Sequence, residues 1–400
     1  MKLNELLNNV KVEWKKLGEV FDTRVGYTPS KRNKEYWENG CVDWFTIADI
    51  RDRGKILDFA NVKISKNAIR GKSFQKNSII LSIIATIGEY ALIRTNFVVN
   101  QQFMVFTLNQ KYKEKINMEF MNYFFYFVSL ECQKYKRISN VPTTDTDKLL
   151  NFQIPIPPLE IQEKIAKTLD KFTNYATELQ TELQLRTKQY EYYRNLLLSK
   201  EFLENMCVKF DDKPCGGGRL ETKMLGEICE ILDYKRKPIT KSKRIAGKYP
   251  YYGANGVQDY VDDYIFDGTF ILMGEDGSVM TKNFTPVLHW VKNSKIWVNN
   301  HAHIFKEIKN KCNLRYVYFY LSIVNISDLV KGVPPKLNQG NLRNIKILIP
   351  PLQIQEKIVQ ILDKFSDIAS NLEKGLPKEI DLRQKEYEFY RDRLLNFKKD

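Results

Sequence analysis

Two long segments of the chain carry apolar residues in alternating steps of four and three, the period of a coiled-coil seam. In the first segment the seam consists of Ile165, Leu169, Phe172, Ala176, Leu179, Leu183, Arg186, Tyr190, Tyr193 and Leu197. In the second it consists of Ile358, Leu362, Phe365, Ala369, Leu372, Leu376, Ile380, Arg383, Tyr387, Tyr390 and Leu394. The pattern predicts two long helices. Because such a seam would be exposed on a lone helix, the simplest partner for one helix is the other.

The second seam differs from the first by one extra four-residue step, which coincides with Gly375-Leu376-Pro377. An insertion of four residues locally unwinds a coiled coil, and proline removes a helical hydrogen bond. We therefore expect the second helix to bend or break there.

The two segments belong to an internal repeat. Pro157-Pro158-Leu159-Glu160-Ile161-Gln162-Glu163-Lys164-Ile165 recurs almost unchanged 193 residues later, and Tyr190-Glu191-Tyr192-Tyr193-Arg194 recurs as Tyr387-Glu388-Phe389-Tyr390-Arg391. The chain is therefore a tandem duplication. Each Pro-Pro pair is expected to end a strand and begin a helix, since proline suits the first helical turn and cannot continue what precedes it.

The segments outside the helices read as mixed α/β domains. Short β-branched and aromatic runs such as 78–84 and 264–272 predict strands, and Cys215-Gly216-Gly217-Gly218 predicts a linker. The predicted division is a first domain at 1–156, a first spacer helix at 157–200, a linker at 201–219, a second domain at 220–349 and a second spacer helix at 350–400.

Charge indicates the class of partner. The 400 residues include 63 Lys and Arg against 48 Asp and Glu, a net charge of +15 that suits a polyanion such as nucleic acid. The polar start of the chain and the lack of a long apolar run favour a cytoplasmic protein that does not bind membranes. Six cysteines without a CxxC pair favour reduced thiols over a zinc or disulfide framework.

The chain contains the same order of elements twice: a globular domain, then Ile-Pro-Pro-Leu-x-x-Gln-x-x-Ile, then a helix ending in Tyr-Glu-x-Tyr-Arg. This order resembles that of the specificity subunits of Type I restriction-modification systems. The resemblance implies a mixed α/β fold with two target-recognition domains in a tandem pseudo-twofold repeat, separated by two long antiparallel coiled-coil helices. It also implies a prokaryotic chain that binds an asymmetric, bipartite target in double-stranded DNA.

The resemblance further implies two methyltransferase subunits that methylate adenine with S-adenosylmethionine, and translocating restriction subunits that use ATP and Mg²⁺. No cofactor is expected in this chain, and no catalytic residue. The chain contains no Asn-Pro or Pro-Asp dipeptide, so the Asn-Pro-Pro-Tyr motif of adenine methyltransferases and the usual Pro-Asp opening of nucleases are both absent.

Candidate DNA contacts are basic and amide side chains in the two domains, because cations reach phosphates and Arg, Asn and Gln read base edges. In the first domain they are Thr28, Ser30, Lys31, Arg32, Lys34, Thr86, Asn100, Gln101 and Gln102. In the second they are Lys235, Arg236, Lys237, Lys241, Lys243, Arg244, Tyr252, Asn255, Asn299, Asn300 and His301. Solvated loops remain the alternative for 28–37, and structural polar clusters at strand ends remain the alternative for 100–102 and 299–301.

The residues near the helix ends are the candidate contacts with other subunits: Tyr190, Tyr193, Arg194, Tyr387, Tyr390 and Arg391. No metal site is predicted, because His289, His301 and His303 lack a supporting pattern of carboxylates.

Three other functions compete with this interpretation: the specificity subunit of a related system that cuts near its site, a fused methyltransferase or nuclease with degenerate motifs, and a coiled-coil scaffold that does not bind DNA.

Overall fold

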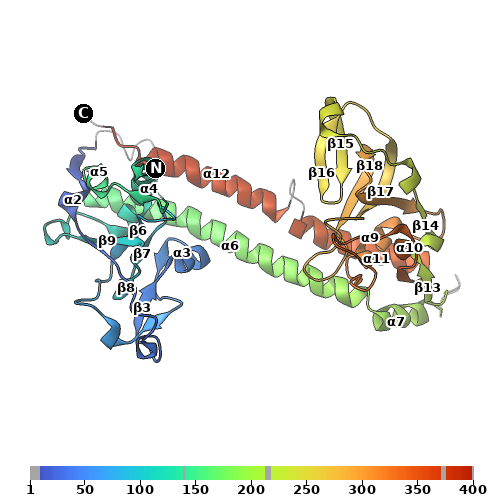
Figure 1. Ribbon diagram of the computed structural model, residues 1–400, viewed down its shortest axis with the longest axis horizontal. Helices are drawn as coiled ribbons and strands as arrows, with labels where there is room; N and C mark the ends of the chain where they lie inside the picture. The colour runs from blue at the N-terminus through green and yellow to red at the C-terminus, as the bar shows by residue number, and fades with distance from the viewer. Residues whose placement is uncertain (1–9, 138–139, 212–217, 371–374, 399–400) are drawn as a thin grey trace. The chain divides into compact units, whose positions relative to one another are not determined.

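The computed structural model describes residues 10–137, 140–211, 218–370 and 375–398 (Figure 1). The contacts divide the chain into two compact units, Met1–Glu178 with Ile380–Asp400, and Leu179–Glu379. The division falls inside the long helix α6 (Leu159–Leu197), so each unit contains one globular domain and segments of both spacer helices.

The first unit is built on a five-stranded sheet in the order β2-β9-β6-β7-β4, with a three-stranded sheet β5-β3-β8 beside it in the same domain. These strands are β2 (Phe21–Val25), β9 (Phe103–Leu108), β6 (Ser78–Ser82), β7 (Tyr90–Ile93), β4 (Ile56–Leu57), β5 (Lys63–Ile64), β3 (Val42–Phe45) and β8 (Phe97–Val99). A separate antiparallel pair joins β1 (Glu13–Lys16) to β12 (Gln153–Ile156), and another joins β10 (Lys136–Arg137) to β11 (Thr143–Thr144). The helices of this domain are α2 (Leu17–Val20), α3 (Ile47–Arg53), α4 (Met118–Lys134) and α5 (Thr146–Leu150).

The second unit repeats this plan in one six-stranded sheet of order β14-β19-β17-β18-β15-β16. Its strands are β14 (Cys229–Ile231), β19 (Ala302–Glu307), β17 (Phe266–Gly274), β18 (Leu288–Val298), β15 (Ala246–Gly253) and β16 (Gly256–Val261), and β13 (Glu221–Met224) pairs separately with β20 (Lys346–Ile349). Its shorter helices are α7 (Lys200–Asp211), α8 (Leu225–Ile228), α9 (Leu314–Leu321) and α10 (Gln339–Arg343). The runs predicted as strands form β6 and β17, and both are buried because their β-branched and aromatic residues fill the cores.

The root of each spacer helix confirms the sequence repeat. The helix α6 begins directly after Pro157-Pro158, and α11 (Leu352–Ser370) begins directly after Pro350-Pro351. The buried Gln162 accepts a hydrogen bond from the Asn117 backbone N–H at 2.9 Å and donates to the Pro157 carbonyl at 2.7 Å. Its repeat equivalent Gln355 makes the matching bonds to Asn313 at 2.8 Å and Pro350 at 2.7 Å. One buried amide therefore fastens each helix to its own domain.

The predicted seams pair in both units. In the first unit, Phe172 of α6 stacks on Tyr390 of α12 (Leu376–Leu395), with ring centroids 4.9 Å apart, and Arg383 lies over Tyr175. Because the residue numbers rise along one helix as they fall along the other, the two segments are antiparallel. In the second unit, Tyr193 stacks on Phe365 at 5.1 Å, which is the same pair in the repeat. The antiparallel helix pairing and the mixed α/β class are confirmed.

The second spacer is interrupted where the proline insert predicts. The helix α11 ends at Ser370, Gly375 forms a bend, and α12 starts at Leu376 with Pro377 in its first turn, where its missing N–H is harmless. The predicted Cys215-Gly216-Gly217-Gly218 linker lies almost wholly outside the described residues. The structure differs from the predicted 201–219 linker in its first half, which is the helix α7, because Leu203 and Cys207 are buried in the core of the second unit.

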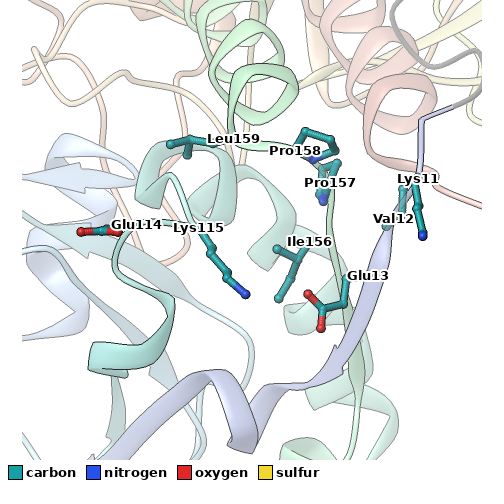
Figure 2. A pocket seen from close by; sticks show the side chains of 9 residues that line it. All are labelled: Lys11, Val12, Glu13, Glu114, Lys115, Ile156, Pro157, Pro158 and Leu159. Atoms are coloured by element: carbon teal, nitrogen blue, oxygen red, sulfur yellow. The ribbon is translucent and has the colours of Figure 1, made fainter.

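An open hollow of about 590 Å³ lies at the root of α6 in the first unit (Figure 2). It is lined by Lys11, Val12, Glu13, Glu114, Lys115, Ile156, Pro157, Pro158 and Leu159. Figure 2 shows Ile156 between Lys115 and Glu13, so apolar surface is flanked by charges of both signs. None of the predicted site residues lines it. Across the described ranges, no helix has the length and apolar character needed to cross a bilayer.

Candidate nucleic-acid interface

In the first domain, three loops that are far apart in sequence meet at the end of the central strands. The Tyr27 backbone N–H donates to the Val99 carbonyl at 2.8 Å, and the Thr28 hydroxyl donates to the Gln101 side chain. The Ile83 N–H donates to the Gln102 carbonyl at 2.8 Å, which brings the turn that carries Thr86 to the same place. The candidates Thr28, Thr86 and Gln101 therefore share one end of the domain.

The second domain brings the equivalent loops together. The Lys237 N–H donates to the Val298 carbonyl at 3.3 Å, the Asn299 N–H donates to the Tyr252 carbonyl at 3.0 Å, and the Glu275 N–H donates to the His301 carbonyl at 2.9 Å. The Asp276 carboxylate also binds His301 Nδ1 at 2.5 Å. The basic run, the turn around Tyr252 and the 299–301 loop thus form one surface.

Each site also contains a loop that the sequence argument missed. The Ala85 N–H donates to the Pro142 carbonyl at 2.8 Å, and the Gly277 N–H donates to the Pro335 carbonyl at 3.2 Å. The signal was present in the sequence, because the equivalent pairs Val141-Pro142 and Pro334-Pro335 each occur shortly before a short capped helix, α5 or α10.

A buried charged network supports the second site. The Arg236 guanidinium lies 2.6 Å from the Glu275 carboxylate and 3.5 Å from the Asp233 carboxylate, and it donates to the Ala302 carbonyl at 2.8 Å. The fully buried His303 places Nδ1 2.6 Å from Asp233 and Nε2 2.8 Å from the Leu337 carbonyl. These bonds tie the start of the basic run to both loops beside it.

The network also fixes the charge of Asp233. Burial by itself would raise the pKa of this carboxyl group, but the hydrogen bond and charge of His303, the charge of Arg236 and the Ile304 backbone N–H together hold it below its ordinary value of 3.8. Asp233 is therefore ionised at neutral pH.

Several candidate side chains turn inward, which differs from their predicted contact with DNA. Arg236 is engaged by the network above, and Arg244 binds Asp259 at 3.2 Å and lies over the Tyr251 ring at 4.2 Å. Asn299 is buried and accepts from the His301 N–H at 2.8 Å, and Asn100 accepts from the Gln102 N–H at 3.0 Å. The physical reason is that the buried polar groups of a loop must be hydrogen-bonded. Some of its polar side chains therefore bind within the protein, and only the others can contact a ligand.

The remaining candidates lie at the surface and stay predictions. The exposed ones are Ser30, Lys31, Arg32, Lys34, Gln101, Lys235, Lys237, Lys241, Lys243, Asn255, Asn300 and His301. Those partly exposed are Thr28, Thr86, Gln102 and Tyr252.

The six predicted subunit contacts are used within the chain. Tyr387, Tyr390 and Arg391 pack against the core of the first unit, where Arg391 lies 3.6 Å from the Tyr126 ring centroid. Tyr190 and Tyr193 pack against the core of the second unit, and Arg194 lies over the Tyr190 ring. The end of each spacer helix therefore completes a core, a role that the seam pattern alone could not reveal.

Asp233, Glu275 and His303 lie close enough to hold a metal ion, and this carboxylate pair is what the sequence argument found missing. The Arg236 guanidinium already binds both carboxylates, and each nitrogen of His303 has a protein partner. The Arg236 guanidinium thus already supplies this cluster with the positive charge that a metal ion would bring.

Comparison with known proteins gives one family. The sequence matches the family described as "Type I restriction modification DNA specificity domain" over residues 9–188 and again over 219–382. Among curated proteins, the EcoprrI Type I restriction enzyme specificity subunit of Escherichia coli is 33% identical over 386 residues, covering 92% of this chain and 91% of that protein. A putative type I restriction enzyme specificity subunit of Haemophilus influenzae is 42% identical over 192 residues, covering 47% of this chain and 49% of that protein.

Solved structures share the fold. The S subunit of a Type I restriction-modification system from M. genitalium matches with a TM-score of 0.62 and 16% identity, over 98% of both chains. A chain from work on complex assembly of the type I R-M system matches with a TM-score of 0.56 and 16% identity, over 98% of both chains.

Proposed function

The chain belongs to the family of Type I restriction-modification DNA specificity subunits, and from that premise we propose that its two domains read two unlike halves of one asymmetric DNA target. The observation that carries this proposal is a shared frame with different exposed side chains. Gln101 and Gln102 lie in the first domain where Asn300 and His301 lie in the second. Because amides and imidazoles read base edges differently, equivalent loops with different side chains favour different base pairs.

The test is a domain exchange read out by sequencing. Replacing residues 220–349 with the second domain of another specificity subunit should change one half of the motif methylated in cells and leave the other half unchanged. The matched control replaces the first domain, 1–156, and should change the opposite half. A graft that changes both halves would contradict independent reading.

We also propose that the chain alone does no chemistry and that S-adenosylmethionine, ATP and Mg²⁺ bind to partner subunits. Support comes from the missing methyltransferase and nuclease motifs and from the polar clusters described above, which bind one another. The purified chain should transfer no methyl group from labelled S-adenosylmethionine to duplex DNA, and addition of the methyltransferase subunits should restore transfer. Transfer by the chain alone would overturn this assignment.

For the methyltransferase subunits we propose a docking surface on the outer faces of the spacer helices. Leu185 and Tyr192 of α6 are 61% and 64% exposed, and their repeat equivalents Leu382 and Phe389 of α12 are 48% and 57% exposed. The same pair of exposed apolar side chains recurs at equivalent positions of both helices, which suits two copies of the same partner. This face is a further candidate interface beside the six residues predicted from the sequence, of which Arg391 is buried and the other five are partly exposed.

Substituting Leu185→Asp with Tyr192→Asp should remove one of the two methyltransferase subunits from the purified complex, and the same changes at Leu382 and Phe389 should remove the other. The control is Gln184→Asp, which adds charge to the same helix at an exposed polar position. Analytical ultracentrifugation gives the stoichiometry. Retention of two subunits by all of these variants would exclude this surface.

A further inference from the structure

A short loop in the second domain presents an apolar side chain directly to solvent. Lys331 and Lys336 form two backbone hydrogen bonds, of 2.9 and 2.8 Å, that close the loop between them. Val333 at its tip is 102% exposed, and two prolines, which restrict the backbone, follow it. A stiff loop loses little entropy when it binds a ligand, so an apolar tip on such a loop is suited to recognition.

The loop is attached to the candidate DNA interface. Besides the bond from Gly277 to Pro335, the Leu337 N–H donates to the Glu275 carbonyl at 2.8 Å, and Lys336 pairs with Asp276 in an isolated bridge. Asp276 in turn binds His301. The base of the loop is therefore tied to the segment that binds His301.

The charge around the tip favours a polyanion. Every residue from 331 to 336 is exposed, and Lys331 and Lys336 flank the apolar tip. The Lys336 side chain is 53% exposed although its ammonium group lies 3.3 Å from Glu275, and that carboxylate is already bound by Arg236. Two cations beside a small apolar group match the groove of a duplex, where phosphates border base edges that include the thymine methyl group.

The first domain has a comparable feature. Val141 is 53% exposed and also directly precedes a proline, whose carbonyl is bound by the turn that carries Thr86. In the second domain the bound carbonyl is that of Pro335, so the residue in register with Val141 is Pro334, the neighbour of Val333. Each domain thus has an exposed loop of this kind tied to its candidate interface.

We propose that Val333 is an apolar base contact of the second domain, on a thymine methyl group in the major groove, and that Lys331 and Lys336 contact the flanking phosphates. This inference rests on the proposed function, because it assigns further contacts to the same DNA site.

The experiment uses the full chain with its methyltransferase subunits and two duplexes, one containing the motif that the wild-type complex methylates in cells and one scrambled. Val333→Ser should weaken binding to the motif duplex about tenfold, as expected for one lost base contact, and leave binding to the scrambled duplex unchanged. Lys331→Gln with Lys336→Gln should weaken binding to both duplexes and lower the salt slope by about two, one for each phosphate contact.

The controls are Val208→Ser, an equally simple change at a valine of α7 that is 66% exposed, and Lys309→Gln at an exposed lysine outside the loop. Both should bind as the wild type does, and urea unfolding of every variant establishes that it is folded. If folded Val333→Ser binds both duplexes as the wild type does, the inference is wrong. If instead the variant loses its methyltransferase subunits while the chain alone keeps its affinity for DNA, the tip is a protein contact and the inference is also wrong. A wild-type complex that does not distinguish the two duplexes would overturn the proposed function itself.

Discussion

The two recognition domains share the order of four strands, β2-β9-β6-β7 and β14-β19-β17-β18, and a loop arrangement, but they differ at the centre of the site. Where the second domain has Asp233 opposite His303, the first has Val25 opposite Met104 in the same strand register. Where the second domain has Glu275, the first has the buried Ile83. The same backbone arrangement thus accommodates either apolar side chains or a charged network at these three adjacent positions.

This difference shows which interactions hold the loops of the second site in place. In the first domain, the segment after β2 is held to the 100–102 loop by the Thr28 hydroxyl. In the second, the equivalent residue is Arg236, and its guanidinium binds two carboxylates and three backbone carbonyls. An ion network that replaces apolar packing costs desolvation energy, and a geometric role is the best reason to keep it.

The largest effect is expected from breaking this network on one side. Arg236→Ala leaves the buried Glu275 without its closest partner and removes one of the charged partners of Asp233, and it should destabilise the second domain by about 3–5 kcal/mol. The equivalent change in the first domain, Thr28→Ala, removes one hydrogen bond and should cost about 1 kcal/mol or less. Urea unfolding measures both, and equal losses would contradict the contrast between the domains.

Replacing the whole network with the first domain's residues tests the same contrast from the other direction. The variant Asp233→Val, Arg236→Thr, Glu275→Ile and His303→Met removes every charge together, so its stability should equal or exceed that of the wild type by up to about 4 kcal/mol. Its discrimination between DNA sequences in the second half of the motif should nevertheless fall, because the guanidinium no longer holds the 299–301 loop. A stable variant with unchanged discrimination would show that the network has no positioning role.

The helix roots should behave similarly in the two units, since Gln162 and Gln355 share two matching bonds and Gln162 adds one more, to the Lys115 carbonyl at 2.8 Å. Gln162→Ala and Gln355→Ala each leave a buried backbone N–H without an acceptor, and each should cost about 1–3 kcal/mol. Hydrogen exchange at Asn117 and Asn313 reports the two sites separately. If only one of the two substitutions lowered the stability, the two helix roots would not be energetically equivalent despite their similar sequences.

The smallest effect concerns acid. Because the pKa of Asp233 in the folded chain lies below its ordinary value of 3.8, the stability it provides is fully present above that pH and is lost as the pH falls further. The wild type should therefore lose more stability than the fourfold variant below about pH 3.8. Urea midpoints measured from pH 7 to pH 3 test this, and parallel profiles down to pH 3 would contradict it.

Much of the framework was predictable because it depends on local rules. The Pro-Pro pairs at 157–158 and 350–351 mark the helix starts, the seam period predicts which aromatic residues face the partner helix, and the Gly-Leu-Pro insert predicts the interruption after α11. The correspondence of the 100–102 and 299–301 loops was predictable as well, because it follows from equivalent positions in the repeat.

The sequence by itself determined the duplication, the helix pair, the positive charge and the family, because periodicity, composition and motif order survive without coordinates. Only the tertiary structure decided which side chains face outward. Arg236 and Arg244 belong to a basic run, yet both find carboxylates across the fold, at Glu275 and Asp259. Such partners are 39 and 15 residues distant in the chain, and only folding brings them within reach. The exposure of Val333 is decided in the same way, since a valine is apolar in any sequence and only the surrounding fold determines whether anything covers it.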